Sequence, residues 1–276
     1  MALRKLYIIY VCIFLSQISL SQSKKYPISA NYIRLGTYSN TNLDAFSFTA
    51  NQATLAQGKN FEAGVFGEKR FLLTELNFYN AAIVVPTKQG NFGIEGNYFG
   101  FSSYNESEIG LAYGRMLGDK VDVGIKFNYY AMRTAGYGNA GTVNFEGGAI
   151  IHLSSKLNAG LHFYNPVGGK LSGKIDEKLS SQYTFGLGYE VSEKFFLSGE
   201  VFKEENIPVN MLAGFQYNLD KQFFVRAGLA SENGNSYAGA GIRWKNFRLD
   251  VSAGYHQQLG FTPGLMLIIQ PKTTKQ

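Results

Sequence analysis

The chain has 276 residues, of which 17% are charged and 15% aromatic, with one cysteine and 32 glycines. Low charge and many aromatic residues exclude a disordered chain, and the single cysteine excludes a disulfide scaffold. The net charge of +6 is modest and not clustered, so we expect no nucleic-acid partner. The composition favours a β-rich protein that exposes apolar side chains to something other than water.

Residues 1–21 have the layout of a secretory signal peptide. Arg4 and Lys5 precede an apolar run of about ten residues, and Ser19 and Ser21 supply small residues before a cleavage site. A membrane-spanning helix needs about 20 apolar residues, so we expect cleavage rather than retention as an anchor. The only cysteine, Cys12, lies within this segment.

Residues 60–270 alternate between apolar and polar side chains and predict an antiparallel transmembrane β-barrel. The clearest run, from Phe247 to His256, alternates without a break, as a strand with two different faces requires. An even number of long strands is expected of a single-chain bacterial outer-membrane barrel. We count about fourteen runs, of which the second and the last alternate poorly: 60–68, 73–85, 91–102, 107–117, 120–132, 141–153, 156–164, 181–191, 194–203, 207–218, 222–231, 236–244, 246–256 and 260–270.

The connections between these runs are alternately very short and longer. This asymmetry is typical of outer-membrane barrels, whose short turns face the periplasm. Aromatic residues flank the short turns on the apolar face, where we expect a girdle at the membrane boundary; the other interpretation is strand-end aromatics in a soluble core. The girdle residues are Tyr189, Phe195, Tyr217, Phe223, Trp244 and Phe247.

The polar face of the strands is expected to line the lumen and carries a set of charged residues. Either these charges pair and hold the lumen closed around a plug, or they line a water-filled interior without specific pairing. Glycines on the same face leave room for a segment that packs closely against it. The charged set is Glu62, Glu95, Asp122, Lys126, Glu146, Glu200, Arg226, Arg243, Arg248 and Asp250.

Residues 22–59 do not alternate and are predicted to form an N-terminal luminal, plug-like segment. Asp44 is suited to cap a short helix over residues 43–56. Residues 271–276 follow the last predicted strand and are expected to form a C-terminal tail.

A motif in this segment resembles the PorV/PorQ family of Bacteroidota outer-membrane proteins, which are relatives of the FadL fatty-acid channels. Asp-Ala and, a few residues later, Asn-x-Ala-x-Leu-Ala stand where that family has its motif, with Gln52 in place of the family's proline. The resemblance implies a fourteen-stranded barrel with a plug, surrounded by the lipid of a Gram-negative outer membrane. The matching residues are Asp44, Ala45, Asn51, Ala53, Leu55 and Ala56.

Catalytic and metal-binding patterns are not visible. There is no G-x-S-x-G motif, and the three histidines, His152, His162 and His256, fall on the luminal face outside any zinc-binding pattern. We therefore expect no enzyme, no cofactor and no metal.

Two functions remain open. The resemblance implies a non-enzymatic accessory of type IX protein secretion or surface attachment, which would contact a larger secretion barrel and its cargo, with residues 165–180 as the candidate contact. The alternative is a FadL-like passive channel for hydrophobic small molecules that opens when residues 43–56 shift. A channel requires apolar luminal side chains, and the exceptions to the polar face are Phe66, Phe99, Phe196, Phe202 and Phe224.

Overall fold

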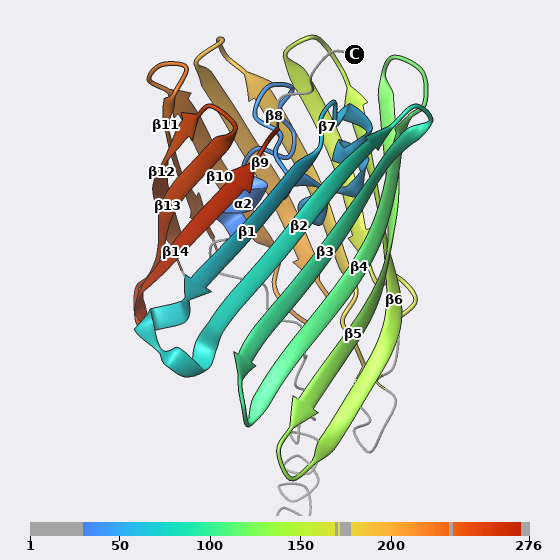
Figure 1. Cartoon of the computed structure of the whole chain (residues 1–276), viewed down its shortest axis with the longest axis vertical. Helices are drawn as coiled ribbons and strands as arrows, with labels where there is room; N and C mark the ends of the chain where they lie inside the picture. Colours follow the sequence, from blue (N-terminus) through green and yellow to red (C-terminus); the bar gives the residue numbers. More distant parts are fainter. Residues whose placement is uncertain (1–29, 169–170, 172–177, 232–233, 272–276) are drawn as a thin grey trace, which may run out of the picture.

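The computed structural model describes residues 30–168, 171, 178–231 and 234–271. The predicted signal peptide, most of the predicted tail and much of the 165–180 connection lie outside these residues. The chain forms a closed, fourteen-stranded antiparallel β-barrel in which each strand pairs with its neighbours in sequence and β1 pairs with β14 (Figure 1). The predicted fold class is thus confirmed.

The strands follow the alternating runs of the sequence closely. Their bounds are β1 Glu62–Lys69, β2 Asn77–Thr87, β3 Gly90–Phe101, β4 Tyr104–Met116, β5 Val121–Thr134, β6 Gly138–His152, β7 Leu157–Tyr164, β8 Gln182–Glu190, β9 Phe195–Glu204, β10 Asn210–Asn218, β11 Phe223–Ala230, β12 Ser236–Trp244, β13 Phe247–His256 and β14 Gly260–Ile269.

The second strand begins four residues later than the sequence predicted. Residues Arg70–Leu72 (η2) and Thr74–Leu76 (η3) form short 3-10 helices before β2. Thr74–Leu76 lie within the predicted strand, and their helical turn excludes them from it. Just before the predicted strand, Phe71 and Leu72 adopt positive φ angles of 51° and 62°. Local backbone geometry therefore overrides the apolar character of Leu73 and its neighbours.

The barrel wall is apolar outside and polar inside. On β13, Phe247, Leu249 and Val251 are 51%, 41% and 60% exposed, whereas Arg248 and Asp250 between them are buried. This is the reverse of a soluble protein, in which apolar side chains are buried. It is the pattern of a transmembrane barrel, whose outer wall faces lipid. Among the described residues, no helix is both long and apolar enough to cross a membrane.

The two ends of the barrel differ. The turns after β2, β4, β6, β8, β10 and β12 form what we call the short-turn end, at the top of Figure 1, where the chain also leaves β14. The opposite loop end contains the longest connection, residues 165–181.

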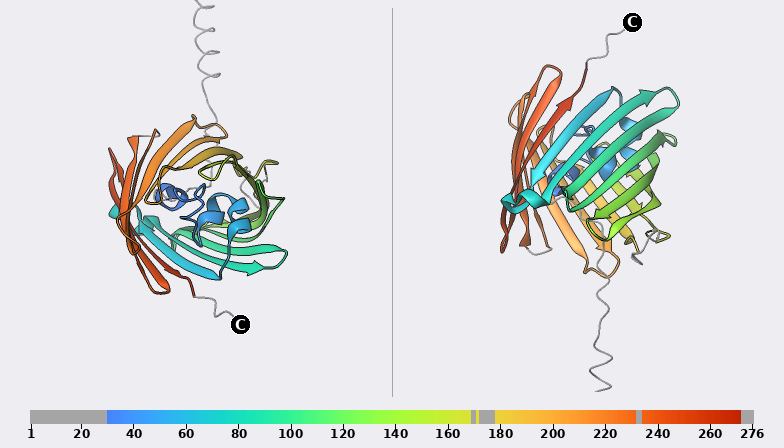
Figure 2. Two further views of the ribbon diagram at one scale, coloured as in Figure 1. Left: turned by 90° about the horizontal axis from the view of Figure 1, so that it is seen from above. Right: turned by 60° about the horizontal axis from the view of Figure 1, so that its bottom comes forward.

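The described part of the segment before β1, from residue 30 onward, lies inside the barrel, as the view along the barrel in Figure 2 shows. It contains α2 (Ala30–Arg34), α3 (Ser47–Ala50) and η1 (Gln52–Gln57). Two short helices thus replace the one predicted over residues 43–56. Asp44 accepts a hydrogen bond from the Phe46 backbone N–H (3.0 Å), and Asn51 caps η1 by accepting one from Ala53 N–H (3.1 Å).

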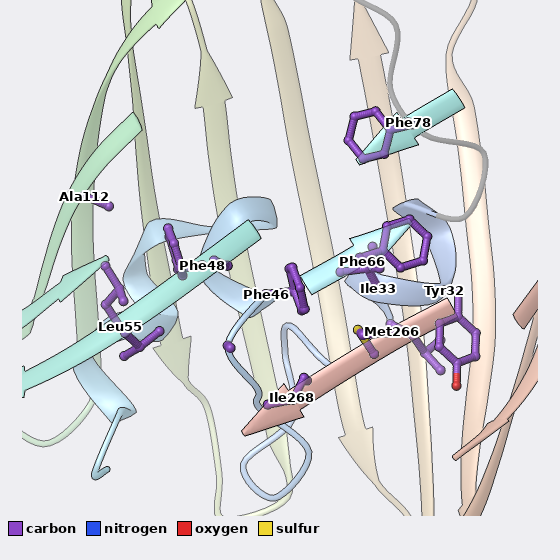
Figure 3. Packing of buried hydrophobic residues seen from close by; sticks show 14 of the residues in the cluster. Tyr32, Ile33, Phe46, Phe48, Leu55, Phe66, Phe78, Ala112, Met266 and Ile268 are labelled. Atoms are coloured by element: carbon purple, nitrogen blue, oxygen red, sulfur yellow. The ribbon is translucent and has the colours of Figure 1, made fainter. Parts of the chain in front are cut away.

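Luminal glycines form much of the surface on which this segment packs. A Cβ added at Gly186 would lie 2.0 Å from the Tyr38 ring, and one at Gly64 would lie 2.5 Å from the Phe46 ring. Figure 3 shows Phe46, Phe48 and Leu55 of the segment within one buried apolar cluster that also includes wall residues. The prediction that luminal glycines make room for a close-lying segment is confirmed at Gly186, whereas the space at Gly241 is taken by Phe224 of the wall.

Candidate functional site

A cavity of about 80 Å³ lies in the lumen between α2, α3 and the wall of strands β2 to β9. Its wall residues on β2 and β8, including Phe78 and Gln182, lie close to the loop-end starts of these strands. We call it the loop-side cavity because it lies on that side of α3. Its lining includes Ile33, Thr49, Phe78, Phe99, Gln182 and Phe202.

Aromatic side chains line two walls of this cavity. Phe78 and Phe99 are buried cross-strand partners on β2 and β3. Phe202 on β9 is the cross-strand partner of Thr184 on β8. From α2, Arg34 donates a hydrogen bond to Thr184 Oγ1 (3.4 Å), and its guanidinium carbon lies 5.7 Å from the Phe202 ring centroid. The cavity can therefore contact a flat apolar molecule on more than one face.

Three of the predicted luminal charges meet beside this cavity. Lys126 Nζ forms ion pairs with Glu95 and, at 3.0 Å, with Glu146 Oε1. Glu146 Oε2 also accepts a hydrogen bond from Gln52 Nε2 (2.7 Å) and lies 3.1 Å from His162 Nε2. All five side chains are buried, and Gln52 links this cluster to the luminal segment.

A second cluster joins the luminal segment to β11 and β13. Arg248 Nη1 lies 2.8 Å from Asp44 Oδ2, and Arg248 Nη2 lies 2.6 Å from Asp250 Oδ2. Arg226 Nη2 approaches Asp44 Oδ2 at 3.7 Å, and the Tyr32 hydroxyl donates to Asp250 Oδ2 at 3.0 Å. The predicted charges Arg226, Arg248 and Asp250 therefore meet around Asp44 of the motif.

The other predicted charges lie apart from these clusters. Glu200 pairs with Arg34 of α2 at 2.7 Å. Asp122 Oδ2 lies 2.8 Å from His152 Nε2 and accepts a hydrogen bond from Gln57 Nε2 at 2.8 Å. The lumen thus holds paired charges, and the contacts of Glu200 and Asp122 tie the wall to the luminal segment or to another strand.

Arg243 and Glu62 have different surroundings. Arg243 Nη1 donates to Asn218 Oδ1 (3.4 Å), and its guanidinium carbon lies 4.3 Å from the Phe224 ring centroid. Glu62, at the start of β1, lines a separate cavity of about 200 Å³ on the short-turn side of α3. We call this the short-turn-side cavity.

The luminal segment is thin between the two cavities. Thr49 and Ala50 of α3 line the loop-side cavity, whereas Ser47 and Phe48 of the same helix line the short-turn-side cavity. One helical turn therefore separates the two spaces.

The motif residues hold this turn in place. Ala45, Asn51, Ala53 and Leu55 are buried, and Ala56 is half-buried. Asn51 Nδ2 donates to Leu161 O of the wall (3.0 Å). Gln52 supplies a hydrogen bond to Glu146 that a proline at this position would lack.

The six predicted girdle residues lie on the outer wall at the short-turn end. Phe195 is half-buried and packs 6.2 Å, centroid to centroid, from its cross-strand partner Tyr217. The other five are exposed on the apolar outer surface. Their position matches a girdle, and their role at the membrane boundary stays a prediction.

Sequence reasoning missed several residues of the site. The sequence could have indicated Gln52, because it departs from the motif. Arg34, Tyr32 and Gln182 belong to no motif that would have indicated them. Within the described ranges, no group of three or more histidine, aspartate or glutamate side chains is placed to hold a metal ion.

Solved structures of similar fold include two hydrocarbon channels. The CymD monoaromatic hydrocarbon channel is 12% identical, with 92% of this chain and 99% of that chain covered and a TM-score of 0.62. The P. putida toluene transporter TodX is 10% identical, with 80% and 91% covered and a TM-score of 0.56. No protein-family model matches the chain, and no curated protein matches it in sequence. The chain therefore shares its fold with hydrocarbon channels.

Proposed function

We propose that this protein is a passive outer-membrane channel for small hydrophobic molecules. The observation that carries the proposal is the aromatic-walled loop-side cavity, separated from the short-turn-side cavity by one turn of α3. The fold shared with CymD and TodX supports it. These similarities favour the channel over the type IX secretion accessory that the PorV/PorQ resemblance implied.

In the proposed mechanism, a ligand enters from the loop end and contacts Phe78, Phe99 and Phe202. The loop-side cavity of about 80 Å³ is smaller than the cavity of about 150 Å³ that admits benzene in a protein core. In the proposed mechanism this cavity belongs to a closed state, and passage requires α3 to move. The ion pairs of Asp44 and the hydrogen bond of Gln52 oppose that movement.

The outer wall supports the proposed location. Its exposed apolar side chains need lipid as their solvent, and the aromatic residues at the short-turn end suit a membrane boundary. Lipid of the outer membrane is accordingly the first partner we propose. The short turns would face the periplasm, so a ligand would travel from the cell surface inward.

Uptake by intact cells tests the proposal. A Gram-negative host without hydrocarbon channels of its own would express the full chain and be supplied with radiolabelled toluene. We expect faster initial uptake than in the same host carrying an empty vector. Heat-modifiable gel mobility would verify that the barrel is folded. Equal uptake in the two strains, with folded protein present, would contradict the channel.

A further inference from the structure

The side chain of Gln182 is buried and lines the loop-side cavity, and its amide has no hydrogen-bond partner among the described residues. It is 1% exposed and lies at the start of β8. Neither Oε1 nor Nε2 has a hydrogen-bond partner among the residues that the structure describes. Buried polar side-chain atoms are mostly hydrogen-bonded, so a site that leaves both ends of one amide unpaired calls for an explanation.

The surroundings of Gln182 are those of a ligand site. Thr184, two residues along the same strand, also lines the cavity beside Phe202. Phe78 and Phe99 supply an apolar wall from β2 and β3. Asn80, beside Phe78 in the lining, has a buried Oδ1 without a partner among the described residues. Aromatic residues and residues with unpaired amide atoms therefore line one cavity.

We propose that the loop-side cavity, once α3 has moved and enlarged it, binds neutral aromatic molecules that carry a carboxamide or hydroxyl group, which hydrogen-bonds to Gln182. Such a group offers both a donor and an acceptor, as the two ends of the Gln182 amide require. A hydrocarbon leaves both ends unpaired. A carboxylate has only acceptors, and it is costly to bury without a free cation, whereas Arg34 is engaged by Glu200 at 2.7 Å.

This inference rests on the proposed channel function, because it names the ligand class of the same cavity. It differs from that function in a measurable way. A hydrocarbon channel requires only the aromatic walls, whereas the inference requires a polar group on the ligand. Binding of three ligands of similar size, namely benzamide, benzoate and toluene, separates the two requirements.

The experiment measures binding of these three probes to the detergent-solubilised protein by isothermal titration calorimetry. We expect benzamide to bind about tenfold more tightly than toluene or benzoate, since each hydrogen bond contributes about two- to tenfold. In Gln182→Met, which keeps the side-chain volume, the affinity for benzamide should fall about tenfold, whereas the affinity for toluene should be retained. The matched control is Gln258→Met, at an exposed glutamine on the loop end.

Folding provides an independent readout. Removing an amide whose two ends are unpaired should raise the unfolding midpoint of the ligand-free Gln182→Met protein. If Gln182→Met does not yield folded barrel, Gln182→Leu serves in its place. An unchanged or lowered midpoint in the folded variant, as when water satisfies the amide, would overturn the inference.

Other outcomes distinguish the two proposals. Equal binding of benzamide and toluene, or benzoate binding as tight as benzamide, would overturn the ligand class while toluene uptake by cells still supports the channel. An unchanged benzamide affinity in Gln182→Met would do the same. Failure of all three probes to bind, together with background toluene uptake, would reject the channel function itself.

Discussion

Arg248 on β13 donates a hydrogen bond from Nη1 to Asp44 Oδ2 at 2.8 Å, across 204 positions of sequence. This contact links the backbone just before α3 to the barrel wall. Both side chains are buried, and Arg248 also holds Asp250. Because α3 separates the two luminal cavities, the closed state of the proposed channel is expected to depend on this pair.

Replacing Arg248 tests that dependence. In Arg248→Met the carboxylates of Asp44 and Asp250 lose their main cation, and breaking such a buried pair costs about 3–5 kcal/mol of unfolding free energy. We expect this loss in urea titrations of the protein in lipid vesicles, together with faster toluene uptake by cells. The control is Lys178→Gln, which removes an exposed ion pair with Glu205; such pairs contribute about 0–1 kcal/mol. Lower stability with unchanged uptake would show that this pair does not keep α3 in its closed position.

The Lys126 cluster makes a second prediction, about coupling between charges. Lys126→Met leaves Glu95 and Glu146 buried without their shared cation. We expect the free energy of unfolding to fall by about 3–5 kcal/mol. The double variant Lys126→Met with Glu95→Gln should recover part of it, because fewer unpaired charges remain. Urea unfolding of the single and double variants gives the coupling energy. Strictly additive losses would contradict the pairing.

The glycine surface makes a third prediction. A methyl group at Gly186 would lie 2.0 Å from the Tyr38 ring, so Gly186→Ala must displace the luminal segment or bend the wall. Overpacking of this kind costs about 1–3 kcal/mol. Gly96→Ala is the matched control on β3, because its new Cβ meets no atom within 4 Å. Equal unfolding midpoints for the two variants would contradict the close packing.

The turn after β10 makes a prediction about pH. Asp220 Oδ1 accepts hydrogen bonds from the backbone N–H groups of Phe223 (2.7 Å) and Gln222 (2.6 Å), which hold the pKa of this carboxyl below its usual range. The folded pKa lies below the unfolded value of about 3.9. The turn is therefore stabilised above about pH 4, and this contribution disappears as the pH falls through the folded pKa.

Carbon-detected NMR titration of the Asp220 carboxyl group measures this effect. We expect a midpoint below that of a model aspartate, and Asp220→Asn should remove the associated pH dependence of stability. A midpoint at or above about 3.9 would contradict the hydrogen-bonded turn.

The strands could be predicted because the alternation of apolar and polar side chains that marks each strand is a local property of the sequence. The two faces of β13 differ at every step from Phe247 to His256, and the structure follows that pattern. The predicted start of β2 was wrong because the helical turn over Thr74–Leu76 leaves no signal in the hydropathy pattern.

The links across the lumen could not be predicted in the same way. The sequence supplied the acids and the arginines, but the pairs that form join distant positions, such as Gln52 with Glu146. Which charges meet depends on how the barrel closes and where the inner segment lies. Gln182 likewise resembles any other polar residue on the luminal face until its neighbours are known.

The seam between β1 and β14 has a consequence for how the molecule assembles. It pairs Ala63 with Ile269, so the barrel can close only when nearly the whole chain has been ordered. Contacts between such distant positions are entropically costly and form slowly. Residues 30–58 precede β1 directly and are enclosed once this seam forms. We infer that this segment enters before or during closure, so that it can act as a template around which the last strands meet.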